Sequence, residues 1–151
     1  MNRIEARELA VRLAFEVSAR ECTADEVLEN FFEREHYDSL APEDALFREF
    51  PDDTQRDYIS AVVRGVWEHS AELDGYVEKY ARGWKFGRIS RTALACMKVA
   101  MYEVMYMPEI PNKAAINAAL DIAKGYDVPE TVRFVNGVLG SFVRGELNEA
   151  L

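Results

Sequence analysis

Long apolar segments, secretory leaders and paired cysteines are all missing from this chain. No run of about eighteen consecutive apolar residues occurs, so we expect no membrane-spanning helix. The N-terminus lacks the apolar segment of a secretory signal, and the two cysteines, Cys22 and Cys96, are too few for a disulfide framework. These features predict a cytoplasmic protein with reduced thiols, in which Cys96, within an apolar run, is a small core residue.

Signatures of catalysis and of cofactor binding are missing as well. His36 and His69 have no second ligand at a metal-binding spacing. No nucleophile elbow, phosphate-binding glycine loop or dinucleotide fingerprint occurs. The many carboxylates fall on helix faces that we expect to be solvated. We therefore predict a protein with no enzymatic activity, no cofactor and no metal ion.

The net charge of −9 argues at first against a nucleic-acid partner. Its distribution changes that interpretation, because residues 21–53 contain twelve acidic residues and two arginines, and the rest of the chain sums to +1. We interpret residues 21–53 as a solvated helix face followed by a loop; the alternative is an acidic shield that repels nucleic acid on one side. Outside this segment the sequence leaves room for basic patches.

Apolar residues recur at helical spacing, and no segment alternates with period two. We therefore predict an all-α fold, a compact bundle of about seven helices in two halves, roughly residues 1–81 and 82–145. The first helix should be capped by Asn2, with Glu5 completing the capping box. It carries a main apolar stripe and a second stripe of Ile4, Val11 and Phe15, so we expect neighbours on both sides of it.

The other expected helices follow from caps and breakers. One should begin at Thr23 or Asp25 and end near His36, before a loop over residues 37–53 with at most one helical turn. A long helical stretch that starts after Asp53 or Thr54 should break near Ser70 or Gly75. The next helix, about residues 89–106, should be the buried axis of the second half.

The last two helices are expected on either side of a turn. Asn112 should cap the first of them, which should end at Lys124 with Gly125 just past its end. Asp127 should cap the second, with Pro129 in its first turn and its end near Arg144. Within this last helix, Gly137 follows Asn136 in an apolar stretch and costs about 1 kcal/mol relative to alanine. Close approach of another helix or of a ligand would explain why it is there.

Three groups of residues are candidates for nucleic-acid binding. The first is Arg3 with Arg7, four residues apart on one helix face, for which a solvated edge is the preferred interpretation. The second is a basic segment interleaved with Trp84 and Phe86, a pattern that suits single-stranded RNA, although we favour core packing of the two rings. Its basic residues are Arg82, Lys85, Arg88 and Arg91. The third comprises Arg133, Phe134 and Asn136, with Lys113 expected nearby; core and surface are equally good interpretations of Phe134.

Several motifs occur in a fixed order along almost the whole chain. They are Arg3-x-x-Ala6-Arg7-Glu8-Leu9-Ala10, Leu13-Ala14-Phe15, Leu73-Asp74, Trp84-x-x-x-Arg88-Ile89, Ala100-Met101-Tyr102-Glu103, Ile110-Pro111, Ala115-Ile116-Asn117, Asp121-Ile122-Ala123-Lys124 and Phe134-Val135-Asn136-Gly137-Val138-Leu139. In this combination and order the chain resembles the NusB family of transcription antitermination factors. One departure from the usual family pattern is the pair Ala93 and Leu94, where an acid–base pair is common.

The resemblance implies an all-helical fold of two small subdomains and a function without catalysis. It implies binding to boxA-like single-stranded RNA of ribosomal RNA operons together with NusE, a small-subunit ribosomal protein, with RNA polymerase and other elongation factors as indirect partners. It places the RNA contacts at Arg3, Arg7, Arg133, Phe134 and Asn136. It places the NusE contact on the side of Tyr102 and Glu103, to which we add Phe15, where the family usually has tyrosine.

Two other functions remain open. NusB-like domains also form the N-terminal part of ribosomal RNA cytosine methyltransferases, although this chain has no room for the methyl-donor domain. A helical protein–protein module that has lost RNA binding is the other, motivated by the sparse N-terminal arginines. About three phosphate contacts to single-stranded RNA give a salt slope of only about −2, so we favour RNA binding as a heterodimer over binding by this chain alone.

Overall fold

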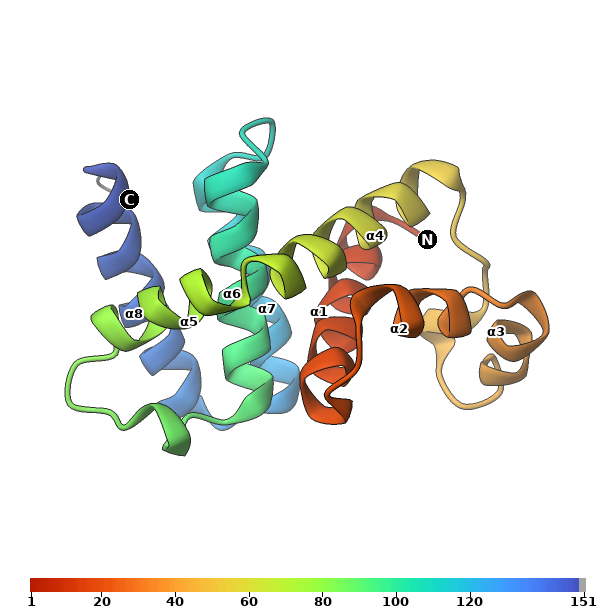
Figure 1. Cartoon of the computed structure of the whole chain (residues 1–151), viewed down its shortest axis with the longest axis horizontal. Helices are drawn as coiled ribbons and strands as arrows, with labels where there is room; N and C mark the ends of the chain where they lie inside the picture. The colour runs from red at the N-terminus through yellow and green to blue at the C-terminus, as the bar shows by residue number, and fades with distance from the viewer. Residues whose placement is uncertain (150–151) are drawn as a thin grey trace. The chain divides into compact units, whose positions relative to one another are not determined.

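The computed structural model describes residues 1–149, and within them the chain forms eight α-helices, two 3₁₀ helices and no strand (Figure 1). This confirms the predicted all-α class. The elements are α1 (Arg3–Arg20), α2 (Ala24–Phe31), α3 (Arg34–Leu40), η1 (Ala45–Phe47), α4 (Asp53–Glu68), α5 (Ser70–Tyr80), η2 (Phe86–Arg88), α6 (Arg91–Tyr106), α7 (Asn112–Tyr126) and α8 (Pro129–Leu147). None of the helices in this part of the chain is both long and apolar enough to span a bilayer.

Contacts divide the chain into two units, Met1–Trp67 and Glu68–Leu151. The helix break predicted near Ser70 is confirmed, since α4 ends at Glu68 and α5 begins at Ser70. The division comes earlier than the expected boundary at residue 81, because α5 packs on α6 and α8. Leu73 of α5 is fully buried in this packing, as is Val77.

In the first unit, the predicted cap of α1 is confirmed: the side-chain oxygen of Asn2 accepts a hydrogen bond of 2.9 Å from the backbone N–H of Glu5. The main apolar stripe of α1 is buried as expected. Of the second stripe, only Val11 is buried, whereas Ile4 is 69% exposed and Phe15 is 37% exposed. The prediction of neighbours along both faces is therefore wrong at those two residues, since a periodic stripe does not reveal how far the neighbouring helices extend.

The prediction of one helix from residue 23 or 25 to His36 is wrong. Helix α2 begins after its Thr23 cap and ends at Phe31. Glu33 then starts α3, because its carboxylate accepts hydrogen bonds from the backbone N–H groups of Glu35 and His36. The loop expected over residues 37–53 is correspondingly shorter, with α3 reaching Leu40 and η1 spanning Ala45–Phe47.

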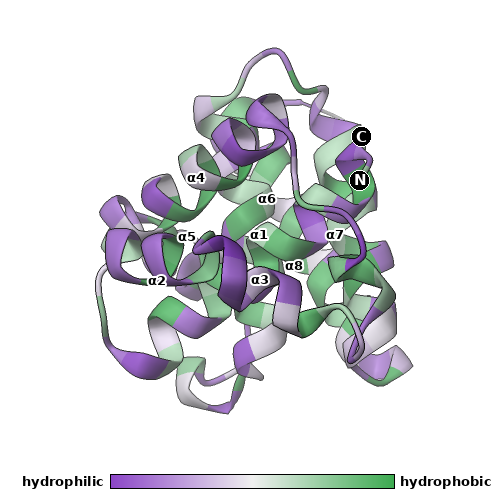
Figure 2. Cartoon of the chain, turned by 90° about the vertical axis from the view of Figure 1, so that its right-hand side faces the viewer, coloured by the Kyte–Doolittle hydropathy of each residue, from purple (hydrophilic) through white to green (hydrophobic). Residues whose placement is uncertain are grey.

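The new helix brings Tyr37 into an aromatic cluster. The ring of Tyr37 is fully buried and lies edge-on to Phe31 at 5.3 Å and to Phe50 at 5.0 Å between centroids. Its hydroxyl donates a hydrogen bond of 2.9 Å to the carbonyl of Glu49. The outer face of α3 is hydrophilic, as Figure 2 shows. Burial of Tyr37 therefore decides the path of the segment between α2 and α4.

In the second unit, α6 is the buried axis, as predicted. It packs against α5, α7 and α8, and Figure 1 shows α5 crossing α6 and α8. Cys96, Met97 and Met101 are fully buried. The helix is capped by Ser90, whose hydroxyl oxygen accepts a hydrogen bond of 3.0 Å from the backbone N–H of Ala93.

The predicted caps of α7 and α8 are wrong. Asn112 is the first residue of α7 and donates its amide to Glu149, 2.6 Å away, while Gly125 lies inside the helix. Asp127 does not cap α8, because its carboxylate accepts from the Ser90 hydroxyl at 3.2 Å. In both places a tertiary partner takes the polar group that local capping would have used. Pro129 begins α8 as expected, and the helix continues past Arg144 to Leu147.

Candidate nucleic-acid interface

The exposed face of α8 near its start carries a cation, a ring and an amide. Arg133 and Asn136 are exposed, and Phe134 is half-buried. Successive residues of a helix are about 100° apart, so Gly137 lies on this face between Arg133 and Phe134, with Asn136 on the far side of Arg133. The opposite face is buried and consists of Val135, Val138, Leu139 and Phe142. Three of the residues predicted to bind RNA therefore share one accessible surface.

Gly137 lies open at the centre of this face. A Cβ atom built there would meet no atom within 4 Å. Of the two explanations considered for this glycine, close approach of another helix is therefore wrong within residues 1–149. A ligand that comes close to the helix backbone is the explanation left.

A depression of about 370 Å³ adjoins this face at the turn between α7 and α8. Its lining combines the cations of Arg133 and Lys124 with the carboxylate of Asp127, and Pro129 and Val132 supply the apolar part. Sequence reasoning did not include Lys124; its position in the last turn of α7, before the turn that leads to α8, was the available signal. Its ammonium lies 3.5 Å from the carboxylate of Asp121, but both side chains are largely exposed, so the pair is weak.

The loop after α5 places Trp84 against Phe134. The ring centroids are 4.5 Å apart and the planes are inclined by 44°. Trp84 is 46% exposed, so the preferred prediction that this ring fills the core is wrong, while Phe86 is half-buried. The reason is a turn at Gly83, whose φ of +80° suits glycine and which is closed by a 3.1 Å hydrogen bond from the backbone N–H of Trp84 to the carbonyl of Ala81.

The cations of this basic segment are all exposed and available. Within residues 1–149, the side chains of the four make no ion pair or hydrogen bond with the protein. They are Arg82, Lys85, Arg88 and Arg91. Side chains of this kind can neutralise phosphates without first giving up an internal partner.

In the first unit, Arg3 and Arg7 do project together, as predicted. Both lie near the ring of Tyr58, a residue of α4. The guanidinium carbons of Arg3 and Arg7 are 4.0 Å and 6.0 Å from the ring centroid. Arg3 is exposed, whereas Arg7 is only 7% exposed. Arg3 therefore presents its charge to solvent, whereas Arg7 lies beside Tyr58 with little exposed surface. Tyr58 is 4% exposed, and its contact with the two arginines could not be predicted from residue spacing.

Lys113 is exposed in the first turn of α7, at the opposite end of that helix from Lys124. A rise of 1.5 Å per residue puts the two lysines about 16 Å apart along the axis. Since Lys124 and Arg133 line the same depression, Lys113 is not adjacent to the Arg133 face. The expectation that it lies nearby is corrected on this point.

The residues expected to contact a protein partner differ in accessibility. Phe15 is 37% exposed and Tyr102 is half-buried, but Glu103 is fully buried and presents no surface to a partner. The ring of Tyr102 stacks with Tyr106 at 5.2 Å, and Tyr106 stacks on His69 at 4.2 Å. Sequence reasoning missed Tyr106, although its position four residues after Tyr102 on one helix was a usable signal.

A hydrogen bond fixes the outer ring of this aromatic surface. The Tyr106 hydroxyl donates to Glu72 at 2.7 Å, which raises the pKa of Tyr106 to about 12. The ring of Tyr106 stays 39% exposed. His69, Tyr102 and Tyr106 thus form a surface of three adjacent rings, and the Tyr106 hydroxyl is held in place and stays protonated at physiological pH. Such a surface suits contact with a protein better than contact with phosphates.

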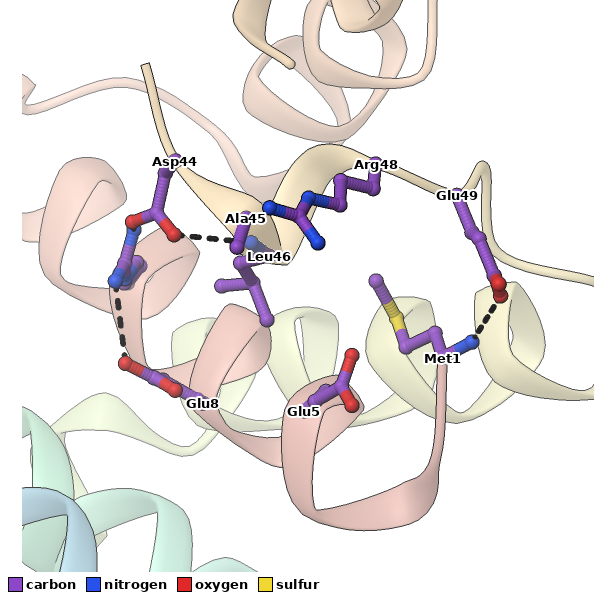
Figure 3. A pocket seen from close by; sticks show the side chains of 9 residues that line it. Met1, Glu5, Glu8, Asp44, Ala45, Leu46, Arg48 and Glu49 are labelled. Atoms are coloured by element: carbon purple, nitrogen blue, oxygen red, sulfur yellow. Dashed lines mark hydrogen bonds and ion pairs between the residues drawn. The ribbon is translucent and has the colours of Figure 1, made fainter. Parts of the chain in front are cut away.

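The first unit also has a pocket of about 470 Å³ between α1 and the segment around η1 (Figure 3). Carboxylates dominate its lining and disfavour a polyanion there, although Arg12 and Arg48 also border it. The acidic lining residues are Glu5, Glu8, Asp44 and Glu49. Arg12 is held by two of these carboxylates, Glu8 at 3.1 Å and Asp44 at 3.0 Å.

The chemistry available on these surfaces is binding chemistry. No group of three or more His, Cys, Asp or Glu side chains in the described part of the chain could hold a metal ion. Exposed guanidinium groups pair with phosphates, exposed rings stack on bases, and the Asn136 amide can donate to and accept from base edges. Single-stranded nucleic acid is the ligand class that uses all three.

Comparison with known proteins identifies the family of the chain. The sequence profile of the NusB family matches residues 4–144. The transcription antitermination protein NusB of Acetivibrio thermocellus is 35% identical over 150 residues, which cover 99% of this chain and 94% of that protein. The NusB protein of Clostridium novyi is 33% identical, covering 95% and 99% of the two chains.

Solved structures share the fold. NusB from T. maritima superposes with a TM-score of 0.76 at 22% identity, covering 96% of this chain and 93% of that one. A crystal structure described as that of a plectonemic RNA supercoil contains a chain that matches with a TM-score of 0.77 at 18% identity, covering 99% and 100%. The solution structure of NusB from Aquifex aeolicus gives a TM-score of 0.71 at 18% identity, with 97% and 92% covered.

Proposed function

Because the chain belongs to the NusB family, we propose that it is a transcription antitermination factor that binds boxA-like RNA of ribosomal RNA operons together with NusE. In this role it acts in the cytoplasm on nascent RNA and catalyses no reaction. Its effect is to keep RNA polymerase processive, with other elongation factors as indirect partners. The observation that carries the proposal is the exposed face of α8, on which Arg133, Phe134 and Asn136 surround the open backbone at Gly137.

Each group on this face has a separate role in RNA binding. Arg133 neutralises a phosphate, Phe134 stacks on a base, and Asn136 contacts a base edge. The open position at Gly137 lets the strand come close to the helix. Stacking of one base contributes about 1–3 kcal/mol, and each phosphate contact contributes about −0.7 to the salt slope.

Arg3 and Arg7 are separate RNA contacts on the first unit. We expect Arg3 to contribute the larger share, because Arg7 is almost buried beside Tyr58. We include Lys113 as a further phosphate contact, separate from the Arg133 face. With so few accessible cations in each place, affinity for RNA should be low until a second protein adds surface.

NusE is the second protein in this proposal. We assign its contacts to Phe15 on the first unit and, separately, to Tyr102 on the second unit, supported by their exposure and by the stacked rings around Tyr106. Glu103 is fully buried, so it does not touch NusE and contributes only to the packing of α6. Joint binding then explains how a protein with a net charge of −9 binds a polyanion.

Fluorescence anisotropy with a labelled boxA-like RNA, with and without NusE, tests the proposal. We expect a gain in affinity that depends on both NusE and the RNA sequence. Phe134→Ala should weaken binding about 5- to 150-fold, the equivalent of one stacked base. Arg133→Gln should reduce the slope of log K against log salt by about 0.7.

The control is Arg20→Gln, which removes an exposed cation that pairs with Glu16 at the end of α1, outside the proposed contacts. It should leave affinity and salt slope unchanged. An affinity that is the same for boxA-like and scrambled RNA, with or without NusE, would reject the proposal. NusE binding without any RNA contribution at low salt would instead identify a helical protein–protein module.

A further inference from the structure

We propose that Trp84 is a second stacking surface for an RNA base, beside Phe134, and that the basic segment 82–91 extends the RNA-binding face of α8. This inference rests on the proposed function and adds to it a loop that the family-derived contacts do not include. It assigns to the second unit a continuous site for single-stranded RNA, with two adjacent rings and cations on either side of them.

The rings are arranged as a support and an open platform. Their centroids lie 4.5 Å apart, but the planes are inclined by 44°, so a base does not fit between them. Phe134 is half-buried and braces one side of the indole, while Trp84 remains 46% exposed. A base can therefore stack on the outer side of Trp84, with its edge towards α8.

The loop holds Trp84 in place without a ligand. The turn at Gly83 is closed by the hydrogen bond from Trp84 to Ala81, and Ala81 is buried. At the other end Ile89 is buried, and the Ser90 hydroxyl donates to Asp127, in the turn that precedes α8. Because both ends are fixed, little ordering is required when a base binds, which favours affinity.

The charge of the segment selects RNA over a protein partner. Residues 82–91 contain four basic residues and no acidic one, and none of those side chains has a partner within residues 1–149. Cations that alternate with rings along a strand match the alternation of phosphates and bases. Arg133 and Lys124 add two cations of the same unit at the depression beside α8, where Asp127 is the one carboxylate in the lining.

Tryptophan fluorescence can report on the platform directly, because the chain has two tryptophans, Trp67 and Trp84. In a Trp67→Phe variant the only indole is that of Trp84, and we expect its emission to be quenched as boxA-like RNA is added in the presence of NusE. The matched Trp84→Phe variant reports on Trp67, which is 45% exposed in the other unit, and should show the smaller change. Equal changes at both positions, or none at Trp84, would overturn the inference.

Affinity measurements complete the test. Trp84→Ala should weaken RNA binding about 5- to 150-fold, Trp84→Phe should retain most of the affinity, and neither should change affinity for NusE alone. Circular dichroism of each variant shows whether it folds; if Trp84→Ala does not, Trp84→Leu replaces it.

The outcomes separate this inference from the proposed function. If Phe134→Ala weakens RNA binding and Trp84→Ala stays within twofold of the unsubstituted protein, Trp84 is not a stacking surface although the protein binds RNA. If neither change matters while binding still depends on NusE and on the RNA sequence, both rings are excluded as stacking surfaces and the inference is wrong, whereas the proposed function fails only if that dependence is lost. If Trp84→Ala weakens NusE binding and leaves RNA binding intact, the loop is a protein-binding surface and the inference is wrong.

Discussion

The α-amino nitrogen of Met1 lies 2.6 Å from the carboxylate of Glu49, a residue 48 positions away in sequence (Figure 3). The carbonyl of Met1 also accepts a hydrogen bond from the side-chain amide of Gln55, and the Met1 side chain is only 1% exposed. Met1 thus connects the start of α1 to the acidic segment before α4 and to Gln55.

This ion pair predicts a pH window. The hydrogen bond to Glu49 raises the pKa of the α-amino group above its ordinary 8.0, and the ammonium lowers the pKa of Glu49 below its ordinary 4.5. The stabilisation is therefore complete between about pH 4.5 and pH 8; it is lost as the pH rises through the raised pKa of the amine or falls through the lowered pKa of Glu49.

We expect NMR titration of the protein to give an α-amino pKa above 8.0, and Glu49→Gln to return it towards that value. Glu43→Gln, which removes an exposed carboxylate from the same loop, is the matched control and should leave the α-amino pKa unchanged. An α-amino pKa that is the same in the Glu49→Gln protein and in the unsubstituted protein contradicts the assignment.

Lys98 is a buried cation whose ion pair should contribute to the stability of the second unit. Its ammonium lies 2.9 Å from Asp74 and donates to the Ser70 hydroxyl at 2.7 Å, while the residue is 7% exposed. Lys98→Ala should lower the free energy of unfolding by about 1–3 kcal/mol, because it leaves the partly exposed Asp74 without its cation and opens a cavity. Urea denaturation measures this loss.

The double change Lys98→Met with Asp74→Asn serves as the control for Lys98. It removes both charges and keeps the volume, so it should recover much of the lost stability. If Lys98→Ala unfolds at the same urea concentration as the unsubstituted protein, the pair makes no net contribution to stability.

The two cysteines should differ sharply in reactivity. Burial raises the pKa of the Cys96 thiol to about 12, whereas Cys22 is half-buried after the end of α1. At pH 8 about one Cys96 side chain in ten thousand is a thiolate, the form that reacts with iodoacetamide. Intact mass should therefore show one label on the native protein and two in denaturant. Native Cys22→Ser should remain unlabelled; rapid labelling of that variant would show that α6 opens.

The sequence predicted those features that depend on residues close together along the chain. The Asn2 cap and the burial of α6 follow from local capping and from an apolar composition around the whole helix. The path of the chain between α2 and α4 did not follow, because Tyr37 enters a ring cluster with Phe50 that local patterns do not reveal. The caps of α7 and α8 failed for the same reason, since Asp127 bonds Ser90 instead.

The candidate site shows the same limit. The residues of α8 could be predicted, because helical spacing puts Arg133, Phe134 and Asn136 on one face. The exposure of Trp84 could not, because it depends on a turn at Gly83 and on contact with a helix much later in the chain. Burial of Glu103 could not be predicted either, because α6 is apolar on almost all sides and the position of a charged residue along it does not show whether that residue is exposed.

Gly137 offers a test in which stability and function should move in opposite directions. A Cβ atom at this position meets nothing within 4 Å, so Gly137→Ala should raise the free energy of unfolding by about 0.5–1 kcal/mol through better helix propensity. If RNA approaches the backbone there, the same methyl group stands in its path, and affinity for boxA-like RNA should fall about tenfold.

The matched control for Gly137 is Gly75→Ala. This glycine lies within α5, is exposed, and also has nothing within 4 Å of an added Cβ atom, but it lies outside the α8 face. It should stabilise the protein by a similar amount and leave RNA binding unchanged. Thermal unfolding and anisotropy on both variants give the comparison. A Gly137→Ala protein that is stabilised and binds RNA with unchanged affinity would mean that the strand does not approach α8 at this position.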